Sequence, residues 1–162
     1  MNKSIRIFLI ALFALVAAHP AGAASPKKYF EDLSTNLIFD YTYISPSMLK
    51  AMGTRTLSSD ATGISTLQAC DVTSIESVST INGGNDEKLW NAIRKIKSDK
   101  DLETLSTRKE GITRYDILAK LSGNSQFVTN ILVIQQSGGD MVEVVYIEGK
   151  IPISKLQYSS GL

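Results

Sequence analysis

Residues 127–156 read FVTNILVIQQSGGDMVEVVYIEGKIPISKL, in which two apolar runs flank the tetrapeptide Ser137-Gly138-Gly139-Asp140. Adjacent glycines supply the positive φ angles that a type I′ turn requires, so the stretch predicts a β-hairpin that turns at Gly138-Gly139. Both faces of this hairpin would be apolar at their centres, a pattern typical of strands that are covered on both sides. We therefore expect the hairpin to form the centre of a β-sheet.

A two-residue turn also determines which side chains share a face. It places Val133 opposite Val144 and Ile131 opposite Tyr146, because residues equally distant from the turn pair. One face would then carry Ile131, Val133, Val142, Val144 and Tyr146. The other face would carry Leu132, Ile134, Met141, Val145 and Ile147. Short helices can cover one face, and the other would need a loop, a second copy of the chain or another protein. We name the first set as a possible interaction face, although the sequence does not decide which face stays open.

The first 23 residues are typical of a secretory signal peptide. Lys3 and Arg6 precede an unbroken apolar run over residues 7–18, and Ala21-Gly22-Ala23 has the small-x-small pattern of a cleavage site. A membrane anchor is the weaker interpretation, because about twelve apolar residues are fewer than the roughly twenty that span a bilayer. We expect residues 1–23 to be removed, so that residues 24–162 form a single domain.

The mature chain would be nearly neutral and would lack histidine. His19 and two basic residues leave with the signal peptide, so 15 Lys and Arg (17 minus 2) remain against 16 Asp and Glu, a net charge of −1. This balance argues against nucleic-acid binding and against stable membrane association, which both rely on concentrated basic charge. Cys70 is the only cysteine, which excludes an internal disulfide, and it lies far from the cleavage site, which excludes the usual lipoprotein arrangement. We expect a soluble protein of the periplasm or the extracellular space.

Local patterns outside the hairpin predict helices. Ser45 is suited to an N-cap, Pro46 to the first helical position and Gly53 to the left-handed residue that ends a two-turn helix. Its buried stripe would be Met48, Leu49 and Met52. A longer helix is expected over residues 86–98, with charges that suit the helix dipole. Its apolar stripe would be Leu89, Trp90, Ile93 and Ile96. Short helical turns are expected after Ser25-Pro26 and over residues 153–158.

The remaining stretches predict strands and one long loop. Residues 37–44, 73–81 and 102–109 are expected to be strands, and the second should be half-buried because its apolar residues alternate. Residues 54–71 are rich in Thr, Ser and Gly and predict a loop. Residues 112–121 fit either a strand or a helix, and we favour the strand because a hairpin signal, Glu110-Gly111, precedes them. The predicted fold is α+β: one mostly antiparallel sheet of about six strands, in the order β-α-β-α-β-β-β-β-α, with helices packed on one face.

Three stretches carry a family resemblance. They are Tyr43-Ile44-Ser45 before Met48-Leu49, residues 75–81, and residues 142–151 with Ile153 and Leu156 behind them. In these the chain resembles the secreted proteins grouped as domain of unknown function 4252, which are typical of Bacteroidetes. The likeness covers most of the mature chain and consists of framework residues, whereas residues 53–63 depart from it by being long and polar. The resemblance implies an exported α+β domain without an established activity, and it supplies no site residue.

The sequence offers few candidates for catalysis. Without histidine, the mature chain cannot form a Ser-His-Asp or Cys-His arrangement, and it lacks the commonest transition-metal ligand. Two S-x-x-K matches, at Ser47–Lys50 and Ser106–Lys109, lack the K-T-G and S-D-N companions of serine acyltransferases. Residues 82–85, Asn-Gly-Gly-Asn, precede a helix as phosphate-binding loops do. Asp86 and Glu87 would repel an anion there, so a turn with a helix cap is the favoured interpretation.

Other reactive side chains also have simpler explanations. Cys70 has no basic neighbour that would activate it, so we expect an inert and buried thiol. Trp90 lies on an apolar stripe and is expected in the core. Glu143 and Glu148 should lie on opposite faces of their strand, and the pairs Glu31-Asp32 and Asp86-Glu87 are expected at solvated helix starts. The sequence therefore predicts no catalytic, cofactor-binding or metal-binding residue and no cofactor.

Two functional hypotheses remain. The first is a non-catalytic binding or interaction module of the cell envelope, which would bind a second copy of itself or another envelope protein. The alternative is a histidine-independent enzyme of the hydrolase type that uses carboxylate or Ser and Lys groups. The burial of the two sheet faces bears on this choice, because an open apolar face favours association.

Overall fold

The computed structural model describes residues 28–54, 56–59, 64–80, 86–123, 126–138 and 141–156, so the expected signal peptide lies outside the described part. This part contains the helices α1 (Pro46–Met52) and α2 (Glu87–Lys97). Its strands are β1 (Phe39–Ile44), β2 (Thr56–Ser59), β3 (Ile64–Gln68), β4 (Val72–Thr80), β5 (Leu102–Glu110), β6 (Thr113–Leu121), β7 (Phe127–Ser137) and β8 (Met141–Pro152). Three short 3-10 helices are η1 (Glu31–Leu33), η2 (Ala69–Asp71) and η3 (Ile153–Lys155).

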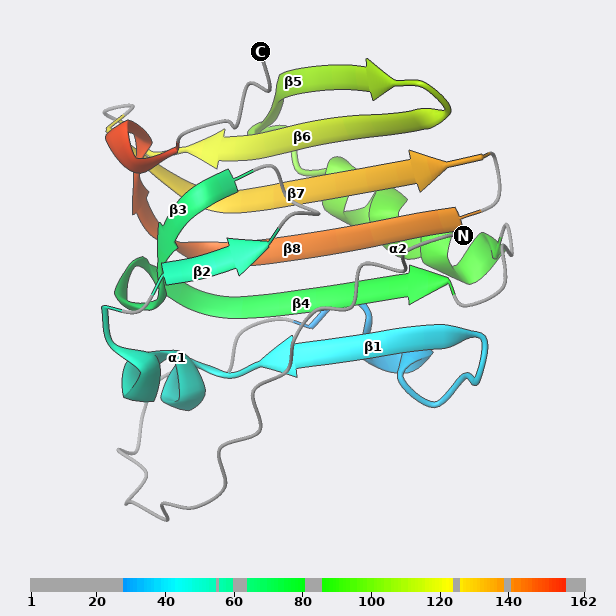
Figure 1. Cartoon of the computed structure of the whole chain (residues 1–162), viewed down its shortest axis with the longest axis horizontal. Helices are drawn as coiled ribbons and strands as arrows, with labels where there is room; N and C mark the ends of the chain where they lie inside the picture. Colours follow the sequence, from blue (N-terminus) through cyan, green and yellow to red (C-terminus); the bar gives the residue numbers. More distant parts are fainter. Residues whose placement is uncertain are drawn as a thin grey trace.

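Six strands form one antiparallel sheet in the order β1-β4-β8-β7-β6-β5 (Figure 1). The hairpin of β7 and β8 occupies its centre, as the apolar runs on both sides of the turn predicted. Residues 113–121 are the strand β6, which settles the ambiguity of this stretch in favour of a strand. The prediction of an α+β fold with a single, mostly antiparallel sheet of six strands is confirmed.

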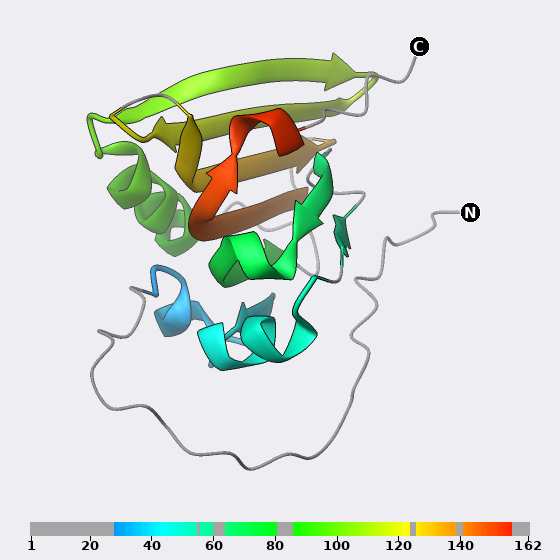
Figure 2. The ribbon, with the colours of Figure 1, turned by 90° about the vertical axis from the view of Figure 1, so that its left-hand side faces the viewer.

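The two faces of the sheet have different covers, which Figures 1 and 2 show from two directions. We call the face beneath α2 and η1 the helix face. Its buried apolar sheet residues are Phe39, Val78, Leu118, Leu132, Ile134, Val142, Val144 and Tyr146. We call the opposite face, beneath α1 and the two-stranded ribbon of β2 and β3, the ribbon face. Its buried sheet residues include Ile117, Ala119, Ile131, Val133, Val145 and Ile147. The expectation that helices pack on one face only is therefore wrong.

The ribbon replaces part of the predicted loop over residues 54–71. β2 and β3 pair antiparallel, and η2 follows them before β4 begins. Leu67 is 2% exposed and Leu57 packs against the same core, although polar residues surround both in the sequence. Sparse apolar residues were enough to hold this segment on the sheet, since burying one Leu side chain stabilises a fold by about 1.5–3 kcal/mol.

The register of the central hairpin differs from the prediction by one residue. Ser137 pairs with Met141, so three residues rather than two connect the strands, and Val133 lies opposite Val145. Because side chains alternate along a strand, a shift of one residue exchanges the faces of one strand relative to the other. The predicted interaction face is therefore divided between the helix face and the ribbon face. All five of its residues are at most 5% exposed: Ile131, Val133, Val142, Val144 and Tyr146.

The helix α1 begins where its sequence predicted, and α2 begins at Glu87, one residue after its predicted start, with Asp86 as its N-cap. The Ser45 hydroxyl accepts a hydrogen bond from the Met48 amide (3.3 Å), and Gly53 has a φ of 61° at the end of α1. Leu49 is buried, but Met48 is 51% exposed, so the predicted stripe of α1 is only partly correct. A helix of two turns presents about one residue per turn to a flat sheet, and the others stay in solvent. The predicted stripe of α2 packs against the helix-face core, with Trp90 half-buried at its edge.

The predicted terminal helical turns are short. η1 buries Leu33 and follows the fully buried Phe30, whereas Ser25-Pro26 lies outside the described residues. η3 ends at Lys155, and the chain beyond residue 156 is outside the described part.

Candidate functional site

A buried carboxylate on the helix face fastens the start of the described chain to the sheet. β4 was expected to be half-buried, but it lies between β1 and β8 under covers on both faces, and Glu76 is 2% exposed. The two carboxylate oxygens of Glu76 accept hydrogen bonds from the backbone amides of Tyr29 and Phe30, each at 2.7 Å. The Tyr41 hydroxyl donates a third bond at 3.2 Å. Burial raises the pKa of Glu76, and the bonds from the two amides act against this rise.

Aromatic side chains continue this arrangement across the helix face. The Tyr29 ring meets the Tyr146 ring edge-on, with 5.0 Å between their centroids. The Tyr146 hydroxyl accepts a hydrogen bond from the Asn130 amide nitrogen at 2.8 Å. Burial raises the pKa of Tyr146 and that of Tyr41 far above the ordinary tyrosine value. Both phenols therefore stay neutral, and they act here as hydrogen-bonding and packing groups.

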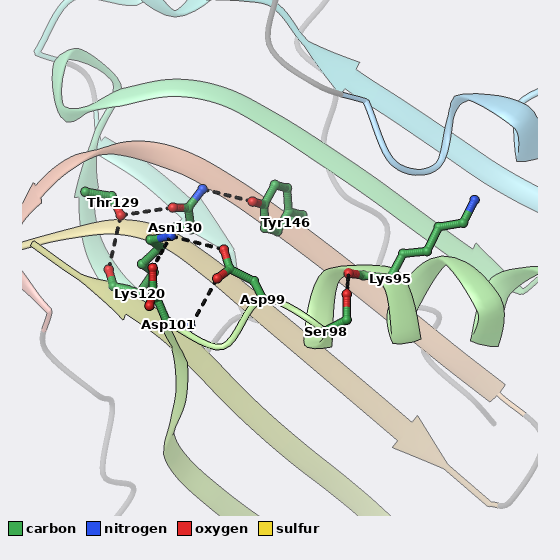
Figure 3. A network of polar contacts seen from close by, with 8 residues as sticks. All are labelled: Lys95, Ser98, Asp99, Asp101, Lys120, Thr129, Asn130 and Tyr146. Carbon is green, nitrogen blue, oxygen red and sulfur yellow. Dashed lines mark hydrogen bonds and ion pairs between the residues drawn. The ribbon is translucent and has the colours of Figure 1, made fainter.

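A polar network joins this cluster to the turn between α2 and β5 (Figure 3). Thr129 donates to the Asn130 side-chain oxygen (2.9 Å) and to the Lys120 backbone carbonyl (3.3 Å). The Lys120 ammonium group lies 2.7 Å from Asp101 and 3.2 Å from Asp99. Bonds to Asp101 and Asp99 raise the pKa of Lys120. Every side chain of this network has a partner within the chain, so its evident role is to position the α2–β5 turn.

The ribbon face carries a polar row that crosses the whole sheet. Cross-strand partners point to the same face of a sheet, with Cβ atoms about 4.5–5.5 Å apart. From edge to edge, the mutually paired residues of this row are Asp40, Ser79, Glu143, Gln135, Tyr115 and Arg108. They lie on the ribbon face because Gln135 and Glu143 alternate with the buried Val133 and Val145. We call this set the polar row.

Two hydrogen-bond acceptors at the centre of the polar row have no donor among the described residues. Gln135 is 7% exposed, and its side-chain oxygen has no hydrogen-bond partner in the described part of the chain. Glu143, directly opposite, is half-buried and makes no hydrogen bond or ion pair to any described residue. Burial alone raises the pKa of Glu143. Glu76, by contrast, accepts hydrogen bonds from three donors.

The outer end of the row on β5 is occupied by a stacked cation. The Arg108 guanidinium lies 5.2 Å from the centre of the Tyr115 ring, and it forms an ion pair with Glu110 at 3.1 Å. Asp40, at the opposite end on β1, is exposed. The charged ends of the row are therefore held at the sheet edges, and the unpaired acceptors lie between them.

The structure does not bring the S-x-x-K residues into a reactive arrangement. Ser47 and Lys50 are exposed on α1, and no hydrogen bond joins them among the described contacts. Ser106 and Lys109 are three residues apart on β5, so their side chains point to opposite faces. The two motifs also lie at different edges of the sheet, since α1 follows β1 and β5 is the other edge strand.

Other sequence predictions have mixed outcomes. Residues 82–85 lie outside the described part, and Asp86 caps α2 by accepting from the amides of Lys88 (2.7 Å) and Leu89 (3.4 Å). Cys70 is exposed rather than buried, because it lies on the outer side of η2. Glu148 accepts from Ser74 on the helix face, so its predicted separation from Glu143 is confirmed.

Sequence reasoning missed Glu76 and Gln135. Glu76 belongs to a strand that was expected to be half-buried, since nothing local reveals that β4 has neighbours on both sides. Gln135 follows the apolar run of β7, and its position in the row depends on partners 8 and 20 residues away in the chain, Glu143 and Tyr115. The signal in the sequence was the position of Gln135, an uncharged but strongly polar residue at the end of a run that is apolar on both faces.

Two general properties of the described residues limit the chemistry. They contain no group of three or more His, Cys, Asp and Glu side chains that could hold a metal ion. None of their helices is long and apolar enough to cross a membrane.

Comparison with known proteins adds no relative to this description. The likeness to domain of unknown function 4252 therefore stays a resemblance carried by framework residues. No family model, no curated protein and no solved structure matches the chain.

Proposed function

We propose that this protein is an exported, non-catalytic binding module of the cell envelope and that the polar row is its ligand-binding surface. The observation that carries this proposal is the buried, unpaired oxygen of Gln135 beside the unpaired carboxylate of Glu143. An unsatisfied buried polar group costs a fold about 1–3 kcal/mol. A ligand that supplies donors at this place removes that cost, so the two acceptors are suited to binding.

The apolar faces of the central hairpin have no part in this proposal. A homodimer or a partner protein on one of these faces was the expectation from the sequence, and the residues named for it are buried within a single chain. The polar row is the other candidate surface, and it suits a ligand that forms hydrogen bonds. We place the contact with an envelope component there.

The hydrolase alternative has weaker support. Acid–base hydrolysis by carboxylates needs two of them about 5–9.5 Å apart on either side of a scissile bond. In the polar row, Asp40 and Glu143 are separated by a whole strand, β4, which corresponds to roughly 10 Å between their backbones. Asp40 is exposed and Glu143 is half-buried, so the two carboxylates lie in different environments.

Export is tested by sequencing the N-terminus of the protein after expression of the full chain in a bacterial host. The proposal expects an exported protein that begins at or near Ala24. Retention of residues 1–23 on protein found in the membrane fraction would contradict export.

Binding is tested by co-sedimentation with envelope preparations of the producing bacterium. We expect wild type to sediment with the envelope material and the double variant Gln135→Ala, Glu143→Ala to remain in the supernatant. Glu148→Gln is the matched control, because it changes a glutamate on the helix face and should sediment like wild type. Equal sedimentation of the double variant and wild type, with both folded by circular dichroism, would exclude the polar row as the binding surface.

A further inference from the structure

We propose that the centre of the polar row, formed by Ser79, Glu143 and Gln135, binds a primary ammonium group. This inference rests on the proposed binding function and adds the chemical class of the ligand. It covers ammonium groups of lysine side chains and of amino sugars, which present the same –NH₃⁺ group to the site.

The three residues provide the acceptors that an ammonium group needs. Glu143 pairs with Ser79 on one side and with Gln135 on the other, so the three side chains are consecutive cross-strand neighbours on the ribbon face. A hydroxyl, a carboxylate and an amide oxygen can each accept a hydrogen bond, and –NH₃⁺ has three donors and no acceptor. Glu143 neighbours both of the other residues, whereas Ser79 and Gln135 are two strands apart, roughly 10 Å between their backbones, so the carboxylate is the acceptor that a single ammonium group shares with either neighbour.

The three residues differ in how far they are exposed to solvent. Gln135 is 7% exposed, whereas Ser79 and Glu143 are half-buried and reachable from solvent. A small cation that lies between the Glu143 and Gln135 side chains would be held by the carboxylate and by the Gln135 oxygen, with Ser79 on the other side of Glu143. Hydrogen bonds between charged groups are roughly twice as strong as neutral ones, so the carboxylate favours a cation over a neutral hydroxyl.

Competing occupants fit less well. An anion would meet the unpaired carboxylate, and the row's cation, Arg108, lies on β5, two strands beyond Gln135, in contact with Tyr115 and Glu110. A hard divalent cation prefers several carboxylates, and the described residues contain no such group. A cation with its own three donors and a single charge needs only one carboxylate, which is what Glu143 supplies.

The test is a titration of the isotope-labelled protein, expressed as the full chain, followed by NMR. The first probe is Nα-acetyl-lysine N-methylamide, with the norleucine analogue as its neutral counterpart. The second probe is glucosamine, with glucose as its neutral counterpart. We expect at least one amine to shift the side-chain amide signals of Gln135 and the carboxyl signal of Glu143 in a saturable manner. Its neutral counterpart should bind at least tenfold more weakly, and the amine that binds more tightly identifies the source of the ammonium group.

Variants separate this site from nonspecific attraction. Glu143→Gln keeps the shape and removes the charge, so it should weaken amine binding at least tenfold, and Gln135→Leu should weaken it severalfold. Glu148→Gln, on the helix face, should bind like wild type. Absence of a saturable shift with both amines, equal binding of the neutral counterparts, or unchanged binding by a folded Glu143→Gln variant would each overturn the inference.

The outcomes also distinguish the inference from the proposed function. Envelope co-sedimentation that depends on the polar row, without amine binding, would refute the ammonium site and leave the binding function standing. Amine binding without envelope co-sedimentation would support the site and refute the envelope function.

Discussion

The helix face and the ribbon face of this sheet are covered by different kinds of elements. On the helix face, the 11-residue helix α2 and the short η1 cover the core, and the polar groups beneath them have partners within the chain. On the ribbon face, the cover consists of the 7-residue α1 and strands of four and five residues. The polar row beside them keeps two acceptors without donors.

Two glutamates express the difference most clearly. Glu76 on the helix face is buried and Glu143 on the ribbon face is half-buried, and burial raises the pKa of each. Glu76 receives two backbone amides and a phenol, so its burial organises the chain. Glu143 receives nothing from the described residues. A buried carboxylate with donors is typical of an anchor, and one without donors is typical of a site that awaits a ligand.

The largest expected effect tests whether both faces are core. Val133→Lys places an unpaired charge on the ribbon face and Ile134→Lys places one on the helix face, at residues only 1% and 2% exposed. Each should destabilise the fold by about 4 kcal/mol or more, because a buried unpaired ammonium group is among the costliest substitutions. Urea unfolding followed by circular dichroism measures the loss. A folded monomeric lysine variant, obtained from a wild type that light scattering shows to be dimeric, would instead mean that the substituted face mediates association.

The next effect tests the anchor on the helix face. Glu76→Ala leaves the amides of Tyr29 and Phe30 without an acceptor and should reduce the free energy of unfolding by about 3 kcal/mol. Glu31→Ala is the control, because Glu31 is exposed and its ion pair with Lys28 lies at the surface, where such pairs contribute little to stability. Similar urea midpoints for the two variants would show that Glu76 does not hold the N-terminal segment.

A smaller effect tests how closely β8 approaches the cover of the ribbon face. A Cβ atom on Gly149 would clash with the Asp71 carbonyl oxygen and lie 2.9 Å from the Val72 Cα. Both are backbone atoms that cannot move aside, so Gly149→Ala should cost about 2 kcal/mol. Gly123→Ala, where nothing lies within 4 Å of the added carbon, should leave the urea midpoint nearly unchanged. Equal stability of the two alanine variants would contradict the close contact between β8 and η2.

The smallest effect concerns the unpaired carboxylate and depends on pH. Because burial raises the pKa of Glu143 in the folded state above its unfolded value, the charged form is destabilising at pH 7. Glu143→Gln should therefore raise the free energy of unfolding at pH 7, by on the order of 1 kcal/mol or less for a half-buried group. This advantage should vanish as the pH falls well below the ordinary glutamate pKa of 4.5, where the carboxyl group of wild type is protonated in both states. A variant less stable than wild type at pH 7 would indicate that Glu143 has a partner.

Much of the framework could be predicted because its causes are local. The caps of α1 and α2, at Ser45 and Asp86, require only a side chain and the amides two or three residues later. The central hairpin follows from two apolar runs around a glycine pair. The ribbon of β2 and β3 was missed because a Thr- and Ser-rich stretch also suits strands when its few apolar residues find a sheet to cover.

The candidate site could not be predicted, because its residues come from six strands. Its composition depends on register, and a single extra residue in the turn of β7 and β8 reassigns every partner along the hairpin. With the predicted two-residue turn, Gln135 would have faced Val142 rather than Glu143. No pattern within either strand distinguishes these pairings, since both strands are apolar on both faces.

The sequence by itself determined most elements of this protein, the N-terminal cap of α1, the α+β class and the central place of the hairpin, because short-range sterics and hydrogen bonds decide them. It also determined that histidine chemistry is absent from residues 24–162. Tertiary structure alone decided which carboxylate is anchored and which is left unpaired. Glu76 has its donors because η1 folds back over β4 from 46 and 47 residues away in the chain. Glu143 lies between Ser79 and Gln135 on the neighbouring strands, and no described residue donates a hydrogen bond to its carboxylate.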